Sequence, residues 1–350
     1  MLRKSKVFFP LLIGLLVVML LCAIAFGAVY ISTADMYGAL RHFAAGKPPA
    51  NIYEGVFLQI RLPRVLLCAI TGAVLAVSGV LMQGLFRNPI VEPGLVGTSA
   101  GAAFGASIVF VLAANMSAEV KSYIGPLLVP LFAFGGGLLA TYVVYALAQT
   151  ARRASILSLL LSGIAVNAVG LSGTGFMSYI ARDPQARSIT FWNLGTFSGA
   201  TWMQAGIVGV VAALIFRIAL RYSKQLNALL LGETEAAYLG VDVQKLQRRI
   251  MIYNTAMVSV ATAFVGVISF MGLIVPHVLR LLIGSDNKAL LPASMITGAI
   301  LLSLADFGAR MLLAPAEIPI GIITSLVGAP IFLFLLRRFD ILQQKGGGHA

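Results

Sequence analysis

The chain has 350 residues, of which 59% are hydrophobic and 11% charged, and its mean hydropathy is +0.95. Soluble globular domains rarely reach such values, so the composition indicates a membrane protein with several spans. The formal net charge of +13 is spread over short segments between apolar runs, which argues against nucleic-acid binding. The two cysteines, Cys22 and Cys68, lie inside apolar runs and have neither metal-ligand nor disulfide-framework spacing.

Runs of about 20 apolar residues are long enough to cross a membrane as helices. We predict ten, in chain order at 7–29, 63–84, 93–114, 126–148, 155–178, 202–221, 250–270, 272–284, 291–311 and 319–337. The eighth is too short to cross without tilt or help from its neighbours. Ten spans put both termini on one side, and the cations at 3–6 and 337–338 make that side the cytoplasm. The sequence therefore predicts an all-α polytopic membrane protein with one transmembrane domain, residues 1–350.

Some cations fall on the predicted outer face, against the usual bias, and these are Arg61, Arg64, Arg182, Arg187 and Arg310. Asp306 stands four residues before Arg310, so the two share a helix face and could pair. A local ion pair that lowers the cost of insertion explains this spacing equally well. Together with Arg61 and Arg64, Arg310 predicts a positive outer surface able to receive acidic groups of a partner.

Two local signals concern how the spans pack and begin. Gly101 and Gly105 have the spacing of a close helix contact in lipid, and ordinary packing accounts for most of the other glycines in the spans. Glu92 and Glu317 each adjoin a proline or stand two residues before one. We expect both to cap helix starts, where a carboxylate meets the positive end of the helix dipole.

Catalytic motifs give no support for an enzyme. Residues 97–101 fit the G-x-S-x-G pattern, but a nucleophile elbow needs a strand-to-helix turn and a His/acid pair, whereas this pattern opens a glycine-rich span. The sequence contains no G-x-x-x-x-G-K-[ST] motif, so it has no P-loop to hold nucleotide phosphates. If transport is driven by ATP, the ATPase is another chain.

The most polar segment is 225–249, which reads QLNALLLGETEAAYLGVDVQKLQRR. Glu233 and Glu235 follow Gly232 as negative charge does at a helix N-terminus, and Gly240 stands where a helix of about two turns would end. Arginines and lysines flank the segment and place it on the cytoplasmic face. We predict a short helix outside the bilayer, where a partner docks.

Several long motifs in a fixed order carry a family resemblance. They are RLPR at 61–64, GVLMQGLFRNPIVEPGLVGTSAGA at 79–102, LLLSGIAVN at 159–167, FWNLGTFSGATW at 191–202, LGETEAAYLGV at 231–241, GVISFMGLIVPHVLRLLIGSDNKALLP at 266–292 and ADFGARMLLAPAEIPIGIITSLVGAPIFLFLL at 305–336. The chain resembles the FecCD-like permeases of type II ABC importers for iron–siderophore complexes, haem and cobalamin, over nearly its whole length.

The resemblance implies a particular assembly. Members of this family have ten spans and form a permease dimer with the path along the subunit interface. They bind two ATPase subunits on the cytoplasmic side and one periplasmic binding protein outside. By this resemblance the chain is a multi-pass protein of the bacterial inner membrane and forms a homodimer. It binds no cofactor or metal itself, with ATP and Mg on the partner ATPase.

Site residues follow from the same motifs. The segment 231–241 resembles the coupling helix that seats in the ATPase, which implicates Gly232, Glu233, Ala236, Ala237, Leu239 and Gly240. The outer arginines of the family, which pair with acidic residues of the binding protein, correspond to Arg61, Arg64 and Arg310. The inner gate corresponds to Ser155, Ile156, Leu157 and Ser158, a more apolar set than in the cobalamin-type relatives, which disfavours cobalamin.

The outer segment 182–202 is most similar to the haem permeases, so haem is the preferred cargo, with ferric siderophore and then cobalamin as alternatives. A porphyrin is a flat apolar disc with two carboxylates. Aromatic, methionine and arginine side chains suit it, and the candidate path residues are Phe176, Met177, Tyr179, Arg182 and Arg187. Packing between spans or contact with lipid headgroups explains the same residues.

Two other functional classes fit the sequence less well. An ion-coupled secondary transporter would keep ionisable groups at mid-bilayer, and the chain has few beyond Asp306. A receptor or structural membrane protein would leave the polar segment 225–249 unexplained.

Overall fold

The structure is a computed structural model that describes residues 2–27, 29–113, 118–150, 153–154 and 156–346. Within these residues the chain is helical except for loops and one short strand pair. The elements are α1 (Leu2–Ala25), α2 (Thr33–Ala44), α3 (Ile52–Val56), the π-helical turn η1 (Phe57–Arg61), α4 (Leu62–Phe86), the 3-10 turn η2 (Pro93–Val96), α5 (Thr98–Leu112), α6 (Ala118–Ala148), β1 (Gln149–Thr150), β2 (Arg153–Ala154), α7 (Ile156–Ile180), α8 (Gln185–Asn193), α9 (Trp202–Leu229), α10 (Glu233–Tyr238), α11 (Val243–Val265), α12 (Met271–Ile283), α13 (Asn287–Met311) and α14 (Ile320–Gly346).

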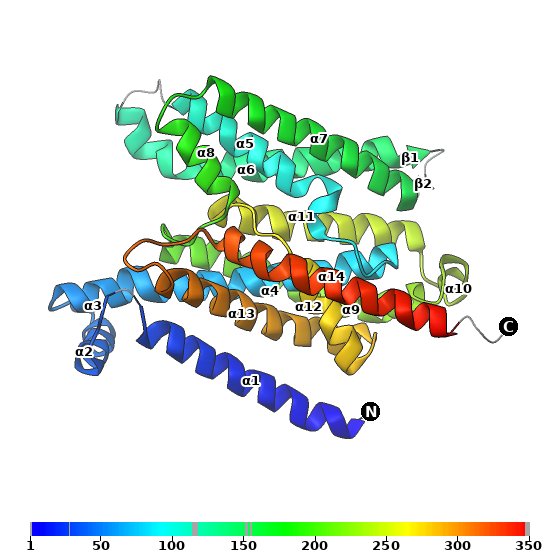
Figure 1. Cartoon of the computed structure of the whole chain (residues 1–350), viewed down its shortest axis with the longest axis horizontal. Helices are drawn as coiled ribbons and strands as arrows, with labels where there is room; N and C mark the ends of the chain where they lie inside the picture. The colour runs from blue at the N-terminus through cyan, green and yellow to red at the C-terminus, as the bar shows by residue number, and fades with distance from the viewer. Residues whose placement is uncertain (1, 28, 114–117, 151–152, 155, 347–350) are drawn as a thin grey trace.

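The long helices lie side by side along one direction, with α1 at one edge of the bundle and α7 at the opposite edge (Figure 1). The start of α1, the end of α14, α10 and the antiparallel pair β1–β2 all lie at one end, and α2, α3 and α8 lie at the other. The Lys/Arg bias makes the first the cytoplasmic end and the second the outer end. This arrangement agrees with the expectation that both termini are cytoplasmic.

The ten predicted spans coincide with ten of these helices. Six are long and apolar enough to cross a membrane by themselves, and α5, α12 and the first part of α14 are shorter apolar helices. The remaining helix of the ten, α11, carries Lys245, Arg248 and Arg249 in its first two turns and becomes apolar beyond them. The fold class predicted from the sequence is confirmed.

The helix α4 is the centre of the bundle, since 83% of its most apolar window is buried against other helices. Glycines let its neighbours come close. A Cβ built on Gly79 would lie 1.8 Å from the carbonyl oxygen of Gly272 in α12, and one on Gly72 would lie 2.2 Å from that of Gly298 in α13. Backbone therefore packs on backbone here, which only glycine allows.

The predicted contact of Gly101 and Gly105 is also present, between α5 and α6. A Cβ on Gly101 would lie 2.4 Å from the carbonyl oxygen of Gly136, and one on Gly105 would lie 2.1 Å from that of Phe132. The spacing of the two glycines predicted a close helix contact, but it did not predict that α6 is the helix that α5 contacts.

Two spans are too short to cross. With 15 and 13 residues, α5 and α12 measure about 20 Å, against about 30 Å for the hydrocarbon core. Irregular backbone followed by the 3-10 turn η2 precedes α5, and irregular backbone precedes α12. The two stretches meet where the Glu92 carboxylate accepts a 2.8 Å hydrogen bond from the N–H of Phe270. Glu92 thus caps the start of α12, a helix far along the chain, and not η2, which follows it directly.

Candidate coupling, docking and path sites

The short helix expected within 225–249 is present as α10 at the cytoplasmic end. Gly232 precedes it with φ +140°, and Gly240 follows its end with φ +81°, so both take backbone conformations that favour glycine. The N–H groups of Gly240 and Val241 donate to the carbonyls of Ala237 and Ala236, which closes the helix. The rest of the segment belongs to the ends of α9 and α11.

One face of α10 is anchored and the other is free. Ala236 is fully buried in the main apolar core, whereas Leu231, Tyr238 and Leu239 are 68%, 87% and 64% exposed. Among the other predicted coupling residues, Ala237 and Gly240 are exposed and Glu233 is half-buried. Apolar side chains exposed outside the bilayer indicate a protein-binding surface.

Polar contacts tie the cytoplasmic ends of several helices together. The Glu233 carboxylate lies 3.7 Å from the guanidinium of Arg87. Arg87 is the residue at which α4 ends, and its backbone has φ +49°. The Asn227 amide in α9 donates to the Asp286 carboxylate at 2.7 Å and accepts from the N–H of Asn287 at 2.8 Å. We did not predict this second link from the sequence. The available signal was the SDN run at 285–287, which is typical of a helix N-cap.

The three predicted docking arginines come together at the outer end, but their side chains face inward. The Arg64 guanidinium bonds Asp306 Oδ1 at 2.9 Å and Glu317 Oε1 at 2.6 Å, and Arg310 Nε lies 3.1 Å from Asp306 Oδ2. The expected pairing of Asp306 with Arg310 is confirmed, and Arg64 joins it. Glu317 binds Arg64 instead of capping a helix, so that expectation was wrong.

Arg61 and Arg310 also hold the outer end of α1. Arg61 donates to the carbonyls of Ile24, Ala25 and Val29, and Arg310 donates to that of Ala23. Cations suit a helix C-terminus, whose carbonyls carry partial negative charge. All three arginines are 5% to 7% exposed. Their docking role therefore stays a prediction, and it requires that a partner reach buried guanidinium groups.

Access to this cluster exists. A cavity of about 240 Å³ at the outer end is lined by Arg64, Asp306 and Glu317 together with the 196–198 loop. The Glu317 side chain is 37% exposed, whereas that of Asp306 is 3% exposed. Glu317 is therefore the member of the cluster that an incoming carboxylate could displace.

The outer helices α2 and α3 are fastened to each other by polar contacts. Glu54 accepts hydrogen bonds from the N–H of Ala50 at 2.7 Å and from His42 at 2.8 Å, and these lower the pKa of its carboxyl. Hydrogen bonds from Ser32 and Asn51 lower the pKa of Asp35 in the same way.

The candidate gate and path residues occupy the two ends of α7. Ser155 lies outside the described residues. Leu157 is 66% exposed at the cytoplasmic end, and Ile156 and Ser158 are half-buried. At the outer end Phe176 and Tyr179 are 58% and 86% exposed, and Met177 is half-buried.

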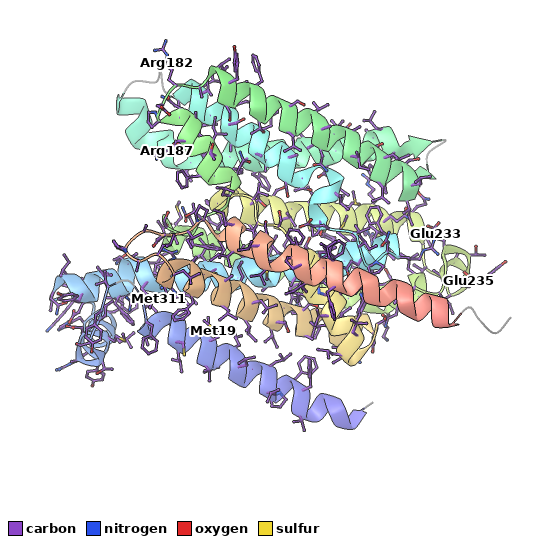
Figure 2. The ribbon with its side chains drawn as sticks, in the orientation of Figure 1. Met19, Arg182, Arg187, Glu233, Glu235 and Met311 are labelled. Atoms are coloured by element: carbon purple, nitrogen blue, oxygen red, sulfur yellow. The ribbon has the colours of Figure 1, made fainter. Side chains whose placement is uncertain are left out.

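Arg182 and Arg187 are exposed at the same outer end, the latter on α8, whereas Glu233 and Glu235 lie at the opposite end of the molecule (Figure 2). Only 17% of the most apolar window of α7 is buried. The apolar surface of this helix needs cover by lipid or by another subunit.

A largely apolar cavity with several polar side chains in its wall, which we did not predict, adjoins α7. It measures about 500 Å³ and is lined by Glu92, Ser99, Asn167 and Asn193, among other residues. The Asn167 amide donates to the carbonyls of Gly94 and Leu95 and so fastens α7 to η2. Ser99 follows a 3-10 turn and not a strand, which agrees with the expectation that no nucleophile elbow is present.

The fold defines a class, a polytopic helical membrane protein with a short helix at its cytoplasmic end. Residues 15–338 match the FecCD transport family, and the chain belongs to that family. It is 40% identical to the hemin transport system permease protein HmuU of Yersinia pestis, over 81% of this chain and 83% of that protein. It is also 40% identical to the cobalamin import system permease protein BtuC of Halobacterium salinarum, over 81% of this chain and 73% of that protein.

A solved structure of a metal-chelate type ABC transporter in an inward-facing conformation superposes with a TM-score of 0.82. That chain is 31% identical, and the match covers 95% of this chain and 99% of the other. The protein is therefore the permease subunit of an ABC importer, and ATP hydrolysis lies in a separate subunit.

Proposed function

We propose that this permease imports haem across the bacterial inner membrane as a homodimer. Two ATPase subunits drive it from the cytoplasm, and a periplasmic binding protein delivers the cargo. The observation that supports haem as the cargo is at the outer end of α7, where Phe176 and Tyr179 are exposed. The cations Arg182 and Arg187 are exposed at the same end of the molecule (Figure 2). Aromatic faces suit a porphyrin ring, and the two arginines suit its two carboxylates.

A haem permease and a cobalamin permease are equally identical to this chain, so the cargo must be identified by measuring uptake. We expect the complete importer in liposomes, with its ATPase and binding protein, to accumulate haem in an ATP-dependent way. Replacing Arg182 and Arg187 together by alanine should lower haem uptake about fivefold, because exposed ion pairs contribute about 0.5 kcal/mol each and about 1 kcal/mol together. If the importer takes up cobalamin or a ferric siderophore but no haem, the proposal that haem is the cargo is wrong. If uptake proceeds without the ATPase, the proposal that ATP hydrolysis drives it is wrong.

Docking of the binding protein would use the outer arginine cluster. A carboxylate of the binding protein would replace Glu317 on Arg64 through the cavity that reaches both residues. The exchange keeps the guanidinium paired throughout, which avoids the cost of leaving a buried charge alone.

Coupling would use the exposed face of α10. We expect Leu239→Ala with Tyr238→Ala to weaken association with the ATPase about thirtyfold, since truncating an interface anchor costs about 2 kcal/mol. Both side chains are exposed in the permease alone, so its fold should be kept. The measurement is ATPase binding and transport-coupled hydrolysis, with Lys245→Ala as the control. If the double variant binds the ATPase as tightly as the control does, the exposed face of α10 is not part of the interface.

A further inference from the structure

A groove of about 600 Å³ runs between α6 and α11 in the cytoplasmic half of the bundle. Its cytoplasmic end is formed by Gln149, directly after the end of α6, and by Arg248 near the start of α11. It continues to Ala256, eight residues farther along α11, which is about 12 Å. The groove therefore begins at the level of the lipid headgroups and extends into the hydrocarbon region.

The lining changes character along this length. Arg248 and Gln149 lie at the shallow end, the rings of Tyr142 and Tyr145 come next, and Leu138 and Phe134 of α6 line the deep part. Among the side chains that the structure describes, Arg248 is the one charged group that lines the groove. Its side chain is exposed, and within the described residues no hydrogen bond or ion pair holds its guanidinium. The neighbouring Arg249, by contrast, donates to the Tyr222 hydroxyl at 3.3 Å.

The rim of the groove faces outward. Tyr142 and Ile252 are 68% and 54% exposed on its two sides. Large apolar side chains at this depth must be covered by lipid tails or by another protein chain. An apolar helix of a second subunit would bury the Arg248 charge without a partner, which is unfavourable. A lipid with a negative headgroup covers the apolar walls and pairs the cation at once.

We propose that this groove binds an anionic phospholipid of the cytoplasmic leaflet. Its phosphate lies on the Arg248 guanidinium, with the tyrosine hydroxyls and the Gln149 amide nearby as further donors. One acyl chain lies between α6 and α11. Basic pockets between helices on the cytoplasmic side suit anionic headgroups, and a zwitterionic lipid offsets part of the attraction with its own cation. The site lies eight residues beyond Gly240, at the base of the helix that follows α10, and it does not depend on the identity of the cargo.

The test uses the full-length permease in complex with its ATPase, purified in mild detergent. Phosphatidylglycerol or phosphatidylethanolamine of the same chain length is titrated in, and bound lipid is counted by native mass spectrometry. We expect Arg248→Gln to lower phosphatidylglycerol binding about fivefold, the loss of one cation near the headgroup, and to leave phosphatidylethanolamine nearly unchanged. Arg249→Gln removes the same charge one residue away and should leave both lipids unchanged.

A second variant tests whether the lipid enters the groove at its cytoplasmic end. Ala146→Trp places a ring on an exposed residue that lines the groove, so it should block both lipids without disturbing the core. Equal losses in Arg248→Gln and Arg249→Gln would show unspecific charge attraction and overturn the proposal. So would displacement of the lipid by millimolar inorganic phosphate, which indicates a free-anion site. Efficient cross-linking of Ile252→Cys to a second permease copy would assign the groove to a protein partner instead.

Discussion

Replacing Asp306 by alanine should destabilise the permease by about 3 to 5 kcal/mol. Asp306 is 2% exposed and pairs with both Arg64 and Arg310, so its removal leaves two buried guanidinium groups short of a counter-charge. The measurement is the midpoint of unfolding by a denaturing detergent, read by tryptophan fluorescence.

The control for this variant is Asp242→Ala. Asp242 pairs with Lys245 at 2.9 Å and caps the start of α11 by accepting a hydrogen bond from the N–H of Lys245. The two side chains are 50% and 73% exposed, so the loss of Asp242 should cost about 1 kcal/mol, mainly the loss of the helix cap. An Asp306→Ala midpoint close to that of the control would mean that Glu317 or the carbonyls at the end of α1 suffice to satisfy the arginines.

Replacing Gly79 by alanine should destabilise the bundle by about 3 kcal/mol or more, because the new methyl group cannot fit. A Cβ at this position would lie 1.8 Å from the carbonyl oxygen of Gly272 and 2.7 Å from its Cα, so α4 and α12 must separate. Since Glu92 caps the start of α12, the shift would also strain the junction of the two half-length helices. We expect a lower unfolding midpoint and loss of ATP-driven uptake in the assembled importer.

A matched substitution separates packing from helix propensity. Gly206 lies in α9, and a Cβ there meets nothing within 4 Å. Gly206→Ala should therefore leave stability unchanged or raise it by up to about 1 kcal/mol, because alanine favours a helix over glycine. If both glycine variants shift the midpoint in the same direction, the close contact of α4 with α12 is not what makes Gly79 necessary.

Local features of the sequence were enough to predict the spans and the short cytoplasmic helix. An apolar run long enough to cross the bilayer is a local property, because lipid solvates each helix separately and every backbone polar group must be satisfied within it. The limits of α10 were equally local, since Gly232 and Gly240 stand where the backbone needs positive φ and two acidic residues occupy the first turn. These signals need no knowledge of neighbouring helices.

Local features could not predict which residues of different helices come into contact. Arg64 pairs with carboxylates 242 and 253 residues away, and this turned an expected positive surface into a buried network. Glu92 caps a helix as expected, but that helix is α12, which is distant in the chain, and not η2, which follows Glu92 directly. The groove ending at Arg248 exists only because α6 and α11 pack together. Sequence spacing fixes contacts within one helix, whereas a contact between helices depends on how the whole bundle packs its glycines and buries its charges.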